Sequence, residues 1–269
     1  MDYGGQAHSY DLVITGSDLV VQQNIRGKRL ILVQEGMTEA ESLLFHLVRR
    51  FKLPRFLANT AATGLSNAYD LFCVASQGYR DHFIQKGIHP QKIAVTGIPN
   101  FDHTETYRHN DFPYRDFVLA ATSCIRETLK PDNRSAFIRW VLEIAGDRQV
   151  IFKLHPNENV ARAIREIKSL DPDALIFTEG NVNHMIANCS VLVTQYSSVV
   201  YVGLALGKEV HSYFDINVLR RMLPIQNGGA SARHIAELCR QLMNIPQAEL
   251  ITARSDYSRH PVWKQPSAT

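Results

Sequence analysis

Cysteine is scarce in this sequence, and no long apolar run interrupts it. The 269 residues include four cysteines, whose spacings match neither a zinc site nor a disulfide framework. Because each cysteine lies in an apolar stretch, we expect buried free thiols in a reducing compartment. No stretch is long enough to span a bilayer, and the first residues, MDYGGQAHSYD, lack the apolar run of a signal peptide. These absences predict a cytoplasmic protein without a transmembrane segment.

A strong charge of either sign is also absent. The 29 Lys and Arg residues nearly balance the 26 Asp and Glu residues, for a net charge of +3. This charge is too mild to argue for nucleic acid or an anionic membrane as a partner, but it is compatible with an anionic small-molecule substrate. The eleven histidines are scattered, and no pair at helical spacing lies beside a third ligand. We therefore expect no tightly held metal and no cofactor.

The common phosphate-binding and nucleophile motifs are missing as well. The sequence has no Walker-type loop and no Gly-x-Gly-x-x-Gly fingerprint. It also lacks the Gly-x-Ser-x-Gly elbow of the α/β-hydrolases. Candidate sites must therefore be sought in the loops between predicted elements.

Short apolar runs alternate with longer amphipathic stretches along the chain. The short runs show little two-residue alternation, which is typical of strands buried on both faces of a parallel sheet. They predict strands over Leu12–Thr15, Leu30–Gln34, Leu71–Ala75, Ile93–Thr96, Phe117–Ala121, Gln149–Leu154, Ala174–Phe177, Val191–Thr194 and Glu209–Tyr213. The longer stretches predict helices over Glu39–Phe51, Gly78–Lys86, Arg134–Ala145, Val160–Ser169, Val182–Ala187, Ser198–Leu206 and Ala232–Met243. Repeated strand-then-helix units predict an α/β fold with parallel sheets.

The polar stretch between Ile98 and Arg115 breaks this rhythm. It carries two prolines and no apolar period, which is typical of a linker between domains. We therefore predict a first Rossmann-like domain over residues 1–105 and a second over residues 116–250. A tail follows over residues 251–269, and it either packs back on the first domain through Tyr257 and Trp263 or is loose.

Two loops of the second domain are the main candidates for a phosphate site. In an open parallel sheet, ligands bind where strands end, and the start of a helix there favours an anion. The turn Gln195-Tyr196-Ser197-Ser198 lies between a strand and an apolar helix, so its serines either cap that helix or bind phosphate. His155 of Lys153-Leu154-His155-Pro156 can donate to phosphate or move a proton, or it can hydrogen-bond within its loop. Lys153 adds positive charge.

Other strand ends carry weaker candidates. Glu35 follows a strand of the first domain, where it serves as a general base toward a hydroxyl acceptor or as a first-turn acid of the next helix. Thr122 and Ser123 can contact phosphate and Arg126 can neutralise it, or all three can lie in a solvated loop. Glu179 lies in a loop that either reads a base edge or is a plain turn.

The exit from the first sheet has candidates of its own. Gly97 permits a close backbone approach or a sharp bend, and Pro99 follows it. We favour a hinge at this position.

Taken in order, several segments resemble known families. The first half, in VASQGYRDHFIQKGIHPQKIAVTGIPNFD, resembles GT-B-fold glycosyltransferases and UDP-N-acetylglucosamine 2-epimerases. The second half resembles the CDP-glycerol glycerophosphotransferases and related capsular-polysaccharide transferases in FKLHPN and CSVLVTQYSSVVYVGLALGKEV. The segment NGGASARHIAELCRQL resembles the late helix of the same fold. The resemblance covers about residues 11–245 and implies a GT-B-type fold with an abbreviated N-terminal domain.

The resemblance also implies a reaction and a site. It implies transfer of a sugar or polyol phosphate from a UDP- or CDP-type donor to a hydroxyl acceptor, in surface-polysaccharide synthesis. Ser197 and Ser198 match the diphosphate-binding turn, together with Gln195 and Tyr196, and His155 matches the histidine of the His-Pro motif. Thr122 and Ser123 match the loop that approaches the phosphates, while Glu35 and Gly36 match the acceptor side. Hydrogen-bond donors then stabilise the departing diphosphate without a metal.

Two departures from the family pattern leave alternatives open. Relatives carry an acidic residue one turn beyond the serines, where this chain has Tyr201, Val202 and Gly203. The first domain is short, so the chain is a fragment, a trimmed member, or a homo-oligomer that completes its sheet with a second subunit. The alternative functions are a UDP-N-acetylglucosamine 2-epimerase or hydrolase and a non-catalytic relative that binds a nucleotide or a partner chain.

Overall fold

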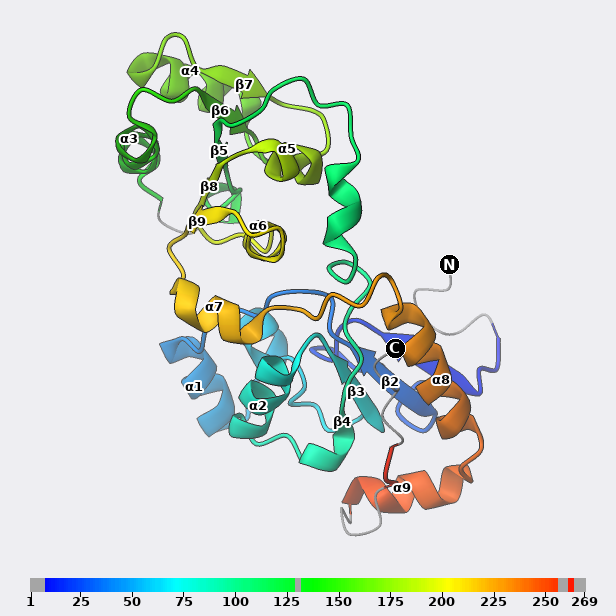
Figure 1. Ribbon diagram of the computed structural model, residues 1–269. Coiled ribbons are helices and arrows are strands. Elements are labelled where there is room, and N and C mark those ends of the chain that lie inside the picture. The colour runs from blue at the N-terminus through cyan, green and yellow to red at the C-terminus, as the bar shows by residue number, and fades with distance from the viewer. Residues whose placement is uncertain (1–7, 129–131, 256–260, 264–269) are drawn as a thin grey trace. The chain divides into compact units, whose positions relative to one another are not determined.

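The computed structural model describes residues 8–128, 132–255 and 261–263. The chain divides into two compact units, the first comprising Met1–His103 and Pro224–Thr269 and the second Thr104–Leu223. Each unit has its own parallel sheet with helices around it (Figure 1). The predicted fold class, two Rossmann-like α/β halves, is confirmed.

The sheet of the first unit has four strands in sequential order. They are β1 (Leu12–Thr15), β2 (Arg29–Val33), β3 (Leu71–Val74) and β4 (Ile93–Val95), and every pairing is parallel. Its early helices are α1 (Leu43–Phe51) and α2 (Gln77–Gln85), with 3₁₀ turns η1 (Arg55–Ala62) and η2 (Pro90–Lys92). Ser42 caps α1 by accepting from the Phe45 amide at 3.2 Å. Helix α1 therefore begins four residues later than the sequence predicted.

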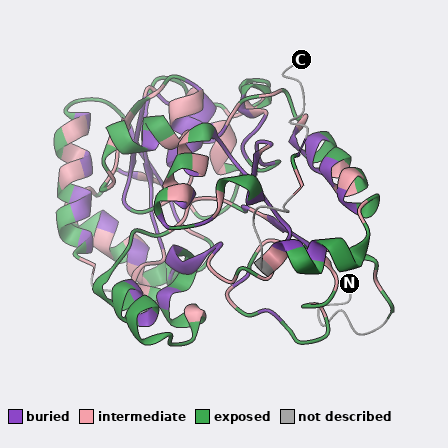
Figure 2. Cartoon of the chain, turned by 90° about the horizontal axis from the view of Figure 1, so that it is seen from below, coloured by how far each residue is buried: buried purple, intermediate pink, exposed green. Residues whose placement is uncertain are grey.

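Helices α2 and α8 (Ser231–Met243) cover opposite faces of this sheet. Phe72 of β3 packs on Phe83 of α2, with ring centroids 4.6 Å apart. Leu71 and Cys73, the neighbours of Phe72 in β3, form one buried cluster with Leu238 of α8. Because alternate residues of a strand point to opposite faces, the two helices enclose the strands from both sides. Figure 2 shows the result, with buried strands and helices that keep an exposed side.

Residues from Pro224 onward belong to the first unit, which corrects the predicted domain boundary. The Ile225 amide donates to the Ala75 carbonyl at 3.0 Å. The Asp102 carboxylate accepts from the Ser231 amide at 3.0 Å, at the start of α8. The predicted second domain, residues 116–250, is therefore wrong beyond Leu223, because the apolar side of α8 is buried on the first sheet.

The end of the chain also contacts the first unit. Helix α9 (Gln247–Ser255) holds Arg254, which pairs with the buried Asp70 carboxylate through Nε at 2.6 Å and Nη2 at 2.7 Å. Trp263 is buried, and its indole Nε1 donates to the Gln91 carbonyl at 2.9 Å. Of the two alternatives predicted for the tail, packing on the first domain and a loose tail, Trp263 follows the first. Tyr257 lies outside the described residues.

The second unit is a doubly wound sheet. Its strands are β5 (Val118–Ala121), β6 (Val150–Lys153), β7 (Leu175–Phe177), β8 (Val191–Thr194) and β9 (Glu209–His211), in the order β7-β6-β5-β8-β9. Helices α3 (Arg134–Ala145) and α4 (Val160–Leu170) bury the face that carries Val118 and Phe152. Helix α6 (Val200–Ala205) covers the other face, where Gly203 leaves room for Leu192 and Val210. Strand order reverses between β5 and β8, the position where such sheets bind ligands.

The remaining elements of the second unit are α5 (Val182–Asn188), α7 (Ile216–Met222) and the 3₁₀ turns η3 (Thr104–Arg108) and η4 (Arg126–Thr128). Turn η3 lies in the stretch predicted to be a linker, yet it packs against α5 and α6. Arg108 Nη2 donates to the Leu206 carbonyl at 3.1 Å. The second part of that stretch is thus built into the second unit. Among the described residues, no helix combines the length and the apolar composition needed to cross a membrane.

Candidate functional site

Three strands of the second unit end at the same level. Ala121, at the end of β5, is in register with Lys153 of β6 and with Thr194 of β8. The residues that follow these strands therefore meet at one edge of the sheet. This is the carboxyl edge on both sides of the point where strand order reverses.

The loops after β5 and β8 are joined by a chain of buried hydrogen bonds. Ser123 Oγ donates to Gln195 Oε1 at 2.9 Å, and Gln195 Nε2 donates to Asp132 Oδ1 at 2.6 Å. Gln195 is fully buried, and its carbonyl accepts from Ser212 Oγ at 2.8 Å. Ser123 and Gln195 thus hold the two loops together, and both side chains are already hydrogen-bonded to protein groups.

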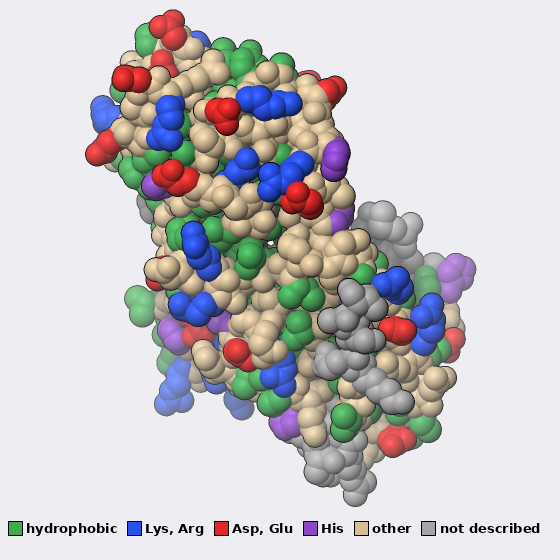
Figure 3. All heavy atoms as spheres, viewed as in Figure 1, with side chains coloured by type: hydrophobic (Ala, Val, Ile, Leu, Met, Phe, Trp, Pro, Cys, Tyr) green, Lys and Arg blue, Asp and Glu red, His purple; other side chains and the backbone are tan. Residues whose placement is uncertain are grey.

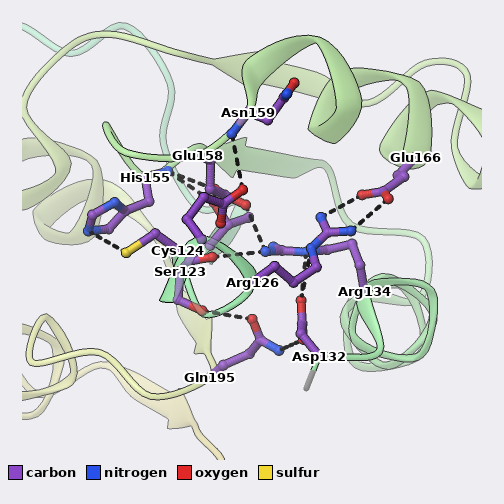
Figure 4. Close-up of polar contacts among 12 residues, drawn as sticks. Ser123, Cys124, Arg126, Asp132, Arg134, His155, Glu158, Asn159, Glu166 and Gln195 are labelled. Carbon is purple, nitrogen blue, oxygen red and sulfur yellow. Dashed lines mark hydrogen bonds and ion pairs between the residues drawn. The ribbon is translucent and has the colours of Figure 1, made fainter. Parts of the chain in front are cut away.

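The loop after β6 is anchored by the buried carboxylate of Glu158. This carboxylate accepts from the His155 amide at 2.9 Å and from Arg134 Nη2 at 2.7 Å. Thr122 Oγ1 donates to it as well, and the same hydroxyl accepts from the His155 amide at 3.1 Å. Figure 4 shows Glu158 between His155 on one side and Arg134 on the other. The Thr122 hydroxyl therefore helps to hold the His155 loop in place through these two buried hydrogen bonds.

The imidazole of His155 is half-buried, and one of its two nitrogens is already hydrogen-bonded within the loop. Its Nδ1 accepts a hydrogen bond from the Asn157 amide at 3.1 Å. Because an acceptor nitrogen cannot carry the proton of the neutral ring, that proton resides on Nε2. Nε2 lies 4.0 Å from Cys124 Sγ, a weak contact. The local hydrogen bond predicted as an alternative is present, and it orients Nε2–H as a donor.

The charged side chains beside these loops neutralise one another. Arg126 forms two hydrogen bonds of 2.8 Å with the Glu166 carboxylate. This pairing raises the pKa of Arg126 and lowers that of Glu166. Asp132 Oδ2 lies 3.6 Å from Arg126 Nε and 3.3 Å from Arg134 Nε. Two guanidinium groups thus face three carboxylates, counting Glu158, so this cluster offers an anion no excess positive charge.

The turn after β8 differs, because two of its backbone amides have no hydrogen-bond acceptor among the described residues. The Val199 amide donates to Ser197 Oγ at 3.5 Å, and helix α6 has no side-chain hydrogen bond at its N-cap, Val199. Within the described ranges, the amides of Ser197 and Ser198 donate no hydrogen bond. Their carbonyls accept from Val200 and Tyr201 at 3.3 and 3.0 Å. Ser197 thus makes a local hydrogen bond at the start of the helix, and phosphate binding by the two serines stays a prediction.

Three further predicted binding residues lie around this edge. Lys153 Nζ donates to the carbonyls of Leu154 and Thr178 at 2.8 and 3.0 Å, and burial lowers its pKa. Its ammonium therefore joins the ends of β6 and β7. Glu179 is exposed in the loop after β7. Tyr196 is 55% exposed, and its ring packs edge-on against Tyr213, with centroids 5.4 Å apart.

The remaining candidates belong to the first unit. Glu35 is exposed after β2, and its backbone carbonyl accepts from Asn100 Nδ2 at 3.0 Å. A Cβ on Gly16 would collide with the Glu35 carboxylate, so glycine there makes room for that side chain. Because α1 begins only at Leu43, Glu35 is not a first-turn acid. Gly36 follows it and is half-buried.

Gly97 and Pro99 lie inside the first unit, before its boundary at His103. Gly97 has φ +74°, and a Cβ there would collide with Ser231 Oγ and lie 2.9 Å from Ile225 Cγ1. Of the two readings offered by the sequence, the geometry at Gly97 is that of a close backbone approach. The hinge stays a prediction.

Sequence reasoning missed the three residues that organise the second-unit site. Asp132, Arg134 and Glu158 are buried and charged, although none follows a strand directly. One signal was available for Glu158, which comes three residues after His155 in His155-Pro156-Asn157-Glu158. That spacing lets a carboxylate return to the amide at the strand end. Asp132 and Arg134 gave no comparable signal.

Metal ligands do not cluster in the part of the chain that is described. No group of three or more His, Cys, Asp or Glu side chains there is arranged to hold a metal ion. The polar groups of this site are instead hydrogen-bond donors and paired charges.

Comparison with known proteins relates the fold to solved enzymes. No family model matches the sequence, and no curated protein matches it. The structure is similar to the UDP-GlcNAc 2-epimerase from Neisseria meningitidis bound to UDP-GlcNAc, with a TM-score of 0.60, 12% identity, and coverage of 86% of this chain and 76% of that one. It is similar to the S. aureus MnaA–UDP co-structure, with a TM-score of 0.55, 14% identity, and coverage of 96% and 77%.

A third similar structure is a variant of the wall teichoic acid polymerase TagF soaked with CDPG. The TM-score is 0.53 at 11% identity, over 87% of this chain and 73% of that one. At such identities the likeness establishes the fold and not the reaction. The chain thus has two α/β units with parallel sheets, the GT-B-type fold of the UDP-GlcNAc 2-epimerases and TagF.

Proposed function

We propose that this protein is a transferase that moves a sugar or polyol phosphate from a nucleotide-diphosphate donor to a hydroxyl acceptor. The donor is of the UDP or CDP type, and its diphosphate binds the second unit at the carboxyl ends of β5, β6 and β8. The reaction belongs to surface-polysaccharide synthesis. We place the protein in the cytoplasm, where its four free thiols stay reduced.

The observation that carries this proposal is the set of uncommitted donors after β8 and β6. The amides of Ser197 and Ser198 make no hydrogen bond within the described residues, and the Nδ1 contact of His155 leaves its proton on Nε2. Free amides at a strand-to-helix turn suit phosphate oxygens. Arg126 and Arg134 are paired with carboxylates. An anionic ligand here therefore depends on neutral donors and backbone dipoles.

These donors assign a chemical role to each group. The leaving group gains negative charge as its bond to the transferred group breaks; it is a nucleoside diphosphate when a sugar moves and a nucleoside monophosphate when a polyol phosphate moves. Donors already in place stabilise that charge without reorganising, which is the most effective form of electrostatic catalysis. His155 Nε2–H and the serine amides take this role in our proposal. Glu35, exposed on the first unit, acts as the base toward the acceptor hydroxyl.

A thermal-shift screen with UDP, CDP and their sugar or glycerol conjugates tests the proposal. A ligand that binds only the folded state stabilises it by about 2.7 kcal/mol at a concentration of 100 Kd. We expect one base to raise the Tm clearly, and His155→Ala to reduce that rise. His109→Ala is the matched control, because His109 is exposed on the same unit and should leave the rise unchanged. A flat response to every nucleotide contradicts the proposal.

Product analysis separates the transferase from its alternatives. Conversion of UDP-N-acetylglucosamine in the absence of an acceptor would indicate a 2-epimerase or hydrolase. Nucleotide binding with no turnover on any acceptor would indicate a non-catalytic relative. The transferase predicts release of the free nucleotide that depends on an added hydroxyl acceptor, and that is abolished in Glu35→Gln.

A further inference from the structure

Helix α1 and the turn after it expose an unusual number of apolar side chains. Leu43 is 84% exposed, Leu47 49%, Phe51 66% and Phe56 52%. Single exposed apolar residues are ordinary, but a contiguous group marks a binding surface. We call residues Leu43–Leu57 the α1 surface; its other exposed apolar members are Leu44, Leu53 and Leu57.

The spacing within α1 arranges these side chains as one stripe. Leu43, Leu47 and Phe51 are four residues apart, so they line one side of the helix. Phe45 and Val48 point instead into the unit and are buried, in a cluster with alanines of η1. More of the surface of α1 is thus apolar than is buried against the rest of the unit. One part of it packs on η1, and the other part is left on the surface.

The α1 surface is also strongly basic. It contains Arg49, Arg50, Lys52 and Arg55, and no acidic residue occurs between Ser42 and Tyr69. These four charges exceed the net charge of +3 for the whole chain, so the rest of the protein carries a slight negative excess. The mild overall charge therefore hides a local concentration. Figure 3 shows basic side chains beside hydrophobic ones over α1.

Most of these cations are available to a partner. Arg49, Arg50 and Lys52 are exposed, and no ion pair joins them to another described side chain. Arg55 is half-buried, and its Nη2 donates to the Asp18 carbonyl at 3.2 Å. The nearest acids in sequence, Glu39 and Glu41, precede the helix. The positive charge of the surface is thus not neutralised from within the described part of the chain.

A hollow beside α1 brings the two properties together. It is lined by apolar Val48, Leu53 and Leu65 and by cationic Arg49, Lys52 and Arg55. A shallower hollow along the exposed stripe is lined by Leu43, His46, Leu47, Arg49 and Arg50. Apolar and cationic groups in one hollow suit an amphiphile whose head is anionic.

We propose that the α1 surface binds the interfacial region of a bilayer that contains anionic phospholipids. A helix with apolar residues on one side and Lys or Arg on the other lies in the plane of such an interface. The lipid phosphates attract the basic side chains within a Debye length of the membrane. A second copy of this chain fits less well, because it would place four more cations against these four. This proposal does not depend on the proposed reaction.

Vesicle co-sedimentation with the full chain tests the inference. The wild-type protein should sediment with phosphatidylcholine vesicles that contain phosphatidylglycerol, and not with phosphatidylcholine alone. High salt should release it, because screening weakens the attraction. The double variants Leu43→Gln with Leu47→Gln, and Arg49→Gln with Arg50→Gln, should each lower the bound fraction about tenfold. All four positions are exposed, so circular dichroism should show an unchanged fold.

Matched controls place the effect on α1. Ile251→Gln changes an apolar residue that is 51% exposed on α9, and Arg220→Gln with Arg221→Gln removes two exposed cations from α7. Both controls should bind vesicles like the wild type. The inference is overturned if the wild type ignores anionic vesicles, or if the α1 variants bind as well as the controls. A dimer in light scattering would also overturn the inference, if that dimer does not bind vesicles and is lost only in the leucine double variant.

Discussion

The backbone amide of His155 donates a 2.9 Å hydrogen bond to the carboxylate of Glu158. The same carboxylate pairs with Arg134 at 2.7 Å, and the two side chains are 1% and 3% exposed. A buried ion pair thus fixes the loop that carries the candidate imidazole. Glu158 is therefore a positioning residue in our proposal, since it acts on His155 through the backbone.

Removing this carboxylate should destabilise the second unit. In Glu158→Ala the Arg134 guanidinium stays buried without its main partner, which costs about 3–5 kcal/mol. The measurement is urea unfolding of the variant and the wild type. Glu143→Ala, an exposed position on α3, should change the free energy of unfolding by less than about 0.5 kcal/mol. Equal effects of the two substitutions would show that the buried pair does not anchor the unit.

The close approach at Gly97 predicts a stability effect in the first unit. Gly97→Ala should cost about 1–2 kcal/mol for a positive φ and about 1–3 kcal/mol more for crowding against Ser231 and Ile225. Gly228→Ala is the control, because Gly228 has φ +65° with nothing within 4 Å of the added Cβ. It should show the backbone cost alone. Urea unfolding measures the loss of stability in each variant. Equal losses would mean that Ser231 and Ile225 move aside without cost when a Cβ is added at Gly97.

The sequence predicted the strands well, because parallel strands buried on both faces are continuous apolar runs. Val191–Thr194 is such a strand, fully buried and with the predicted bounds. Leu12–Thr15 also has the predicted bounds, although Ile14 is 55% exposed. The domain boundary failed at Leu223. The apolar period of α8 shows that one side of the helix is buried, but not which sheet buries it. That choice is made by long-range contacts such as the Asp102 carboxylate with the Ser231 amide.

From the sequence, only those site residues that lie close to the ends of strands could be predicted. Ser123, His155 and Gln195 lie within two residues of the ends of β5, β6 and β8, so strand prediction alone found them. Asp132 and Arg134 precede and begin α3, where a charged residue normally faces solvent. Their burial depends on the Gln195 amide and the Glu158 carboxylate, each more than 20 residues away in sequence. No local pattern encodes such a pairing.

The four thiols should differ sharply in reactivity. Burial raises the pKa of Cys73 and of Cys189 to about 12, so at pH 8 only about one molecule in 10⁴ carries the thiolate at either position. Burial also raises the pKa of Cys239. Cys124 is half-buried in the loop after β5. Alkylation at pH 8 with peptide mass analysis should label Cys124 first, and label Cys73 and Cys189 only in denaturant.

Cys124 then reports on ligand binding. Its Sγ lies 4.0 Å from His155 Nε2, so a diphosphate held by that nitrogen should shield the thiol. We expect the nucleotide that raises the Tm to slow labelling of Cys124 and to leave Cys239 of α8 unaffected. A nucleotide that stabilises the protein without slowing this labelling would place the binding site elsewhere.

The Arg126–Glu166 pair should contribute to the free energy of unfolding only within a defined pH range. The hydrogen bonds from Arg126 lower the pKa of Glu166 below its ordinary value of 4.5, against the opposing effect of burial. A carboxyl whose pKa is lower in the folded state contributes stability that is complete above its unfolded pKa and is lost as the pH falls through its folded pKa. Glu166→Gln should therefore lower the free energy of unfolding by about 1 kcal/mol at pH 7.

The comparison across pH identifies the pair as the cause. Urea unfolding of the wild type and Glu166→Gln should give curves that differ fully at pH 7 and converge below pH 4.5, because protonated Glu166 no longer pairs with Arg126. Glu143→Gln on α3 should show no such convergence, since the Glu143 side chain is exposed. A difference that stays constant down to acid pH would mean that Gln fails for reasons of packing. In that case Arg126 would not be held by charge, and it would be available to a phosphate as the sequence first predicted.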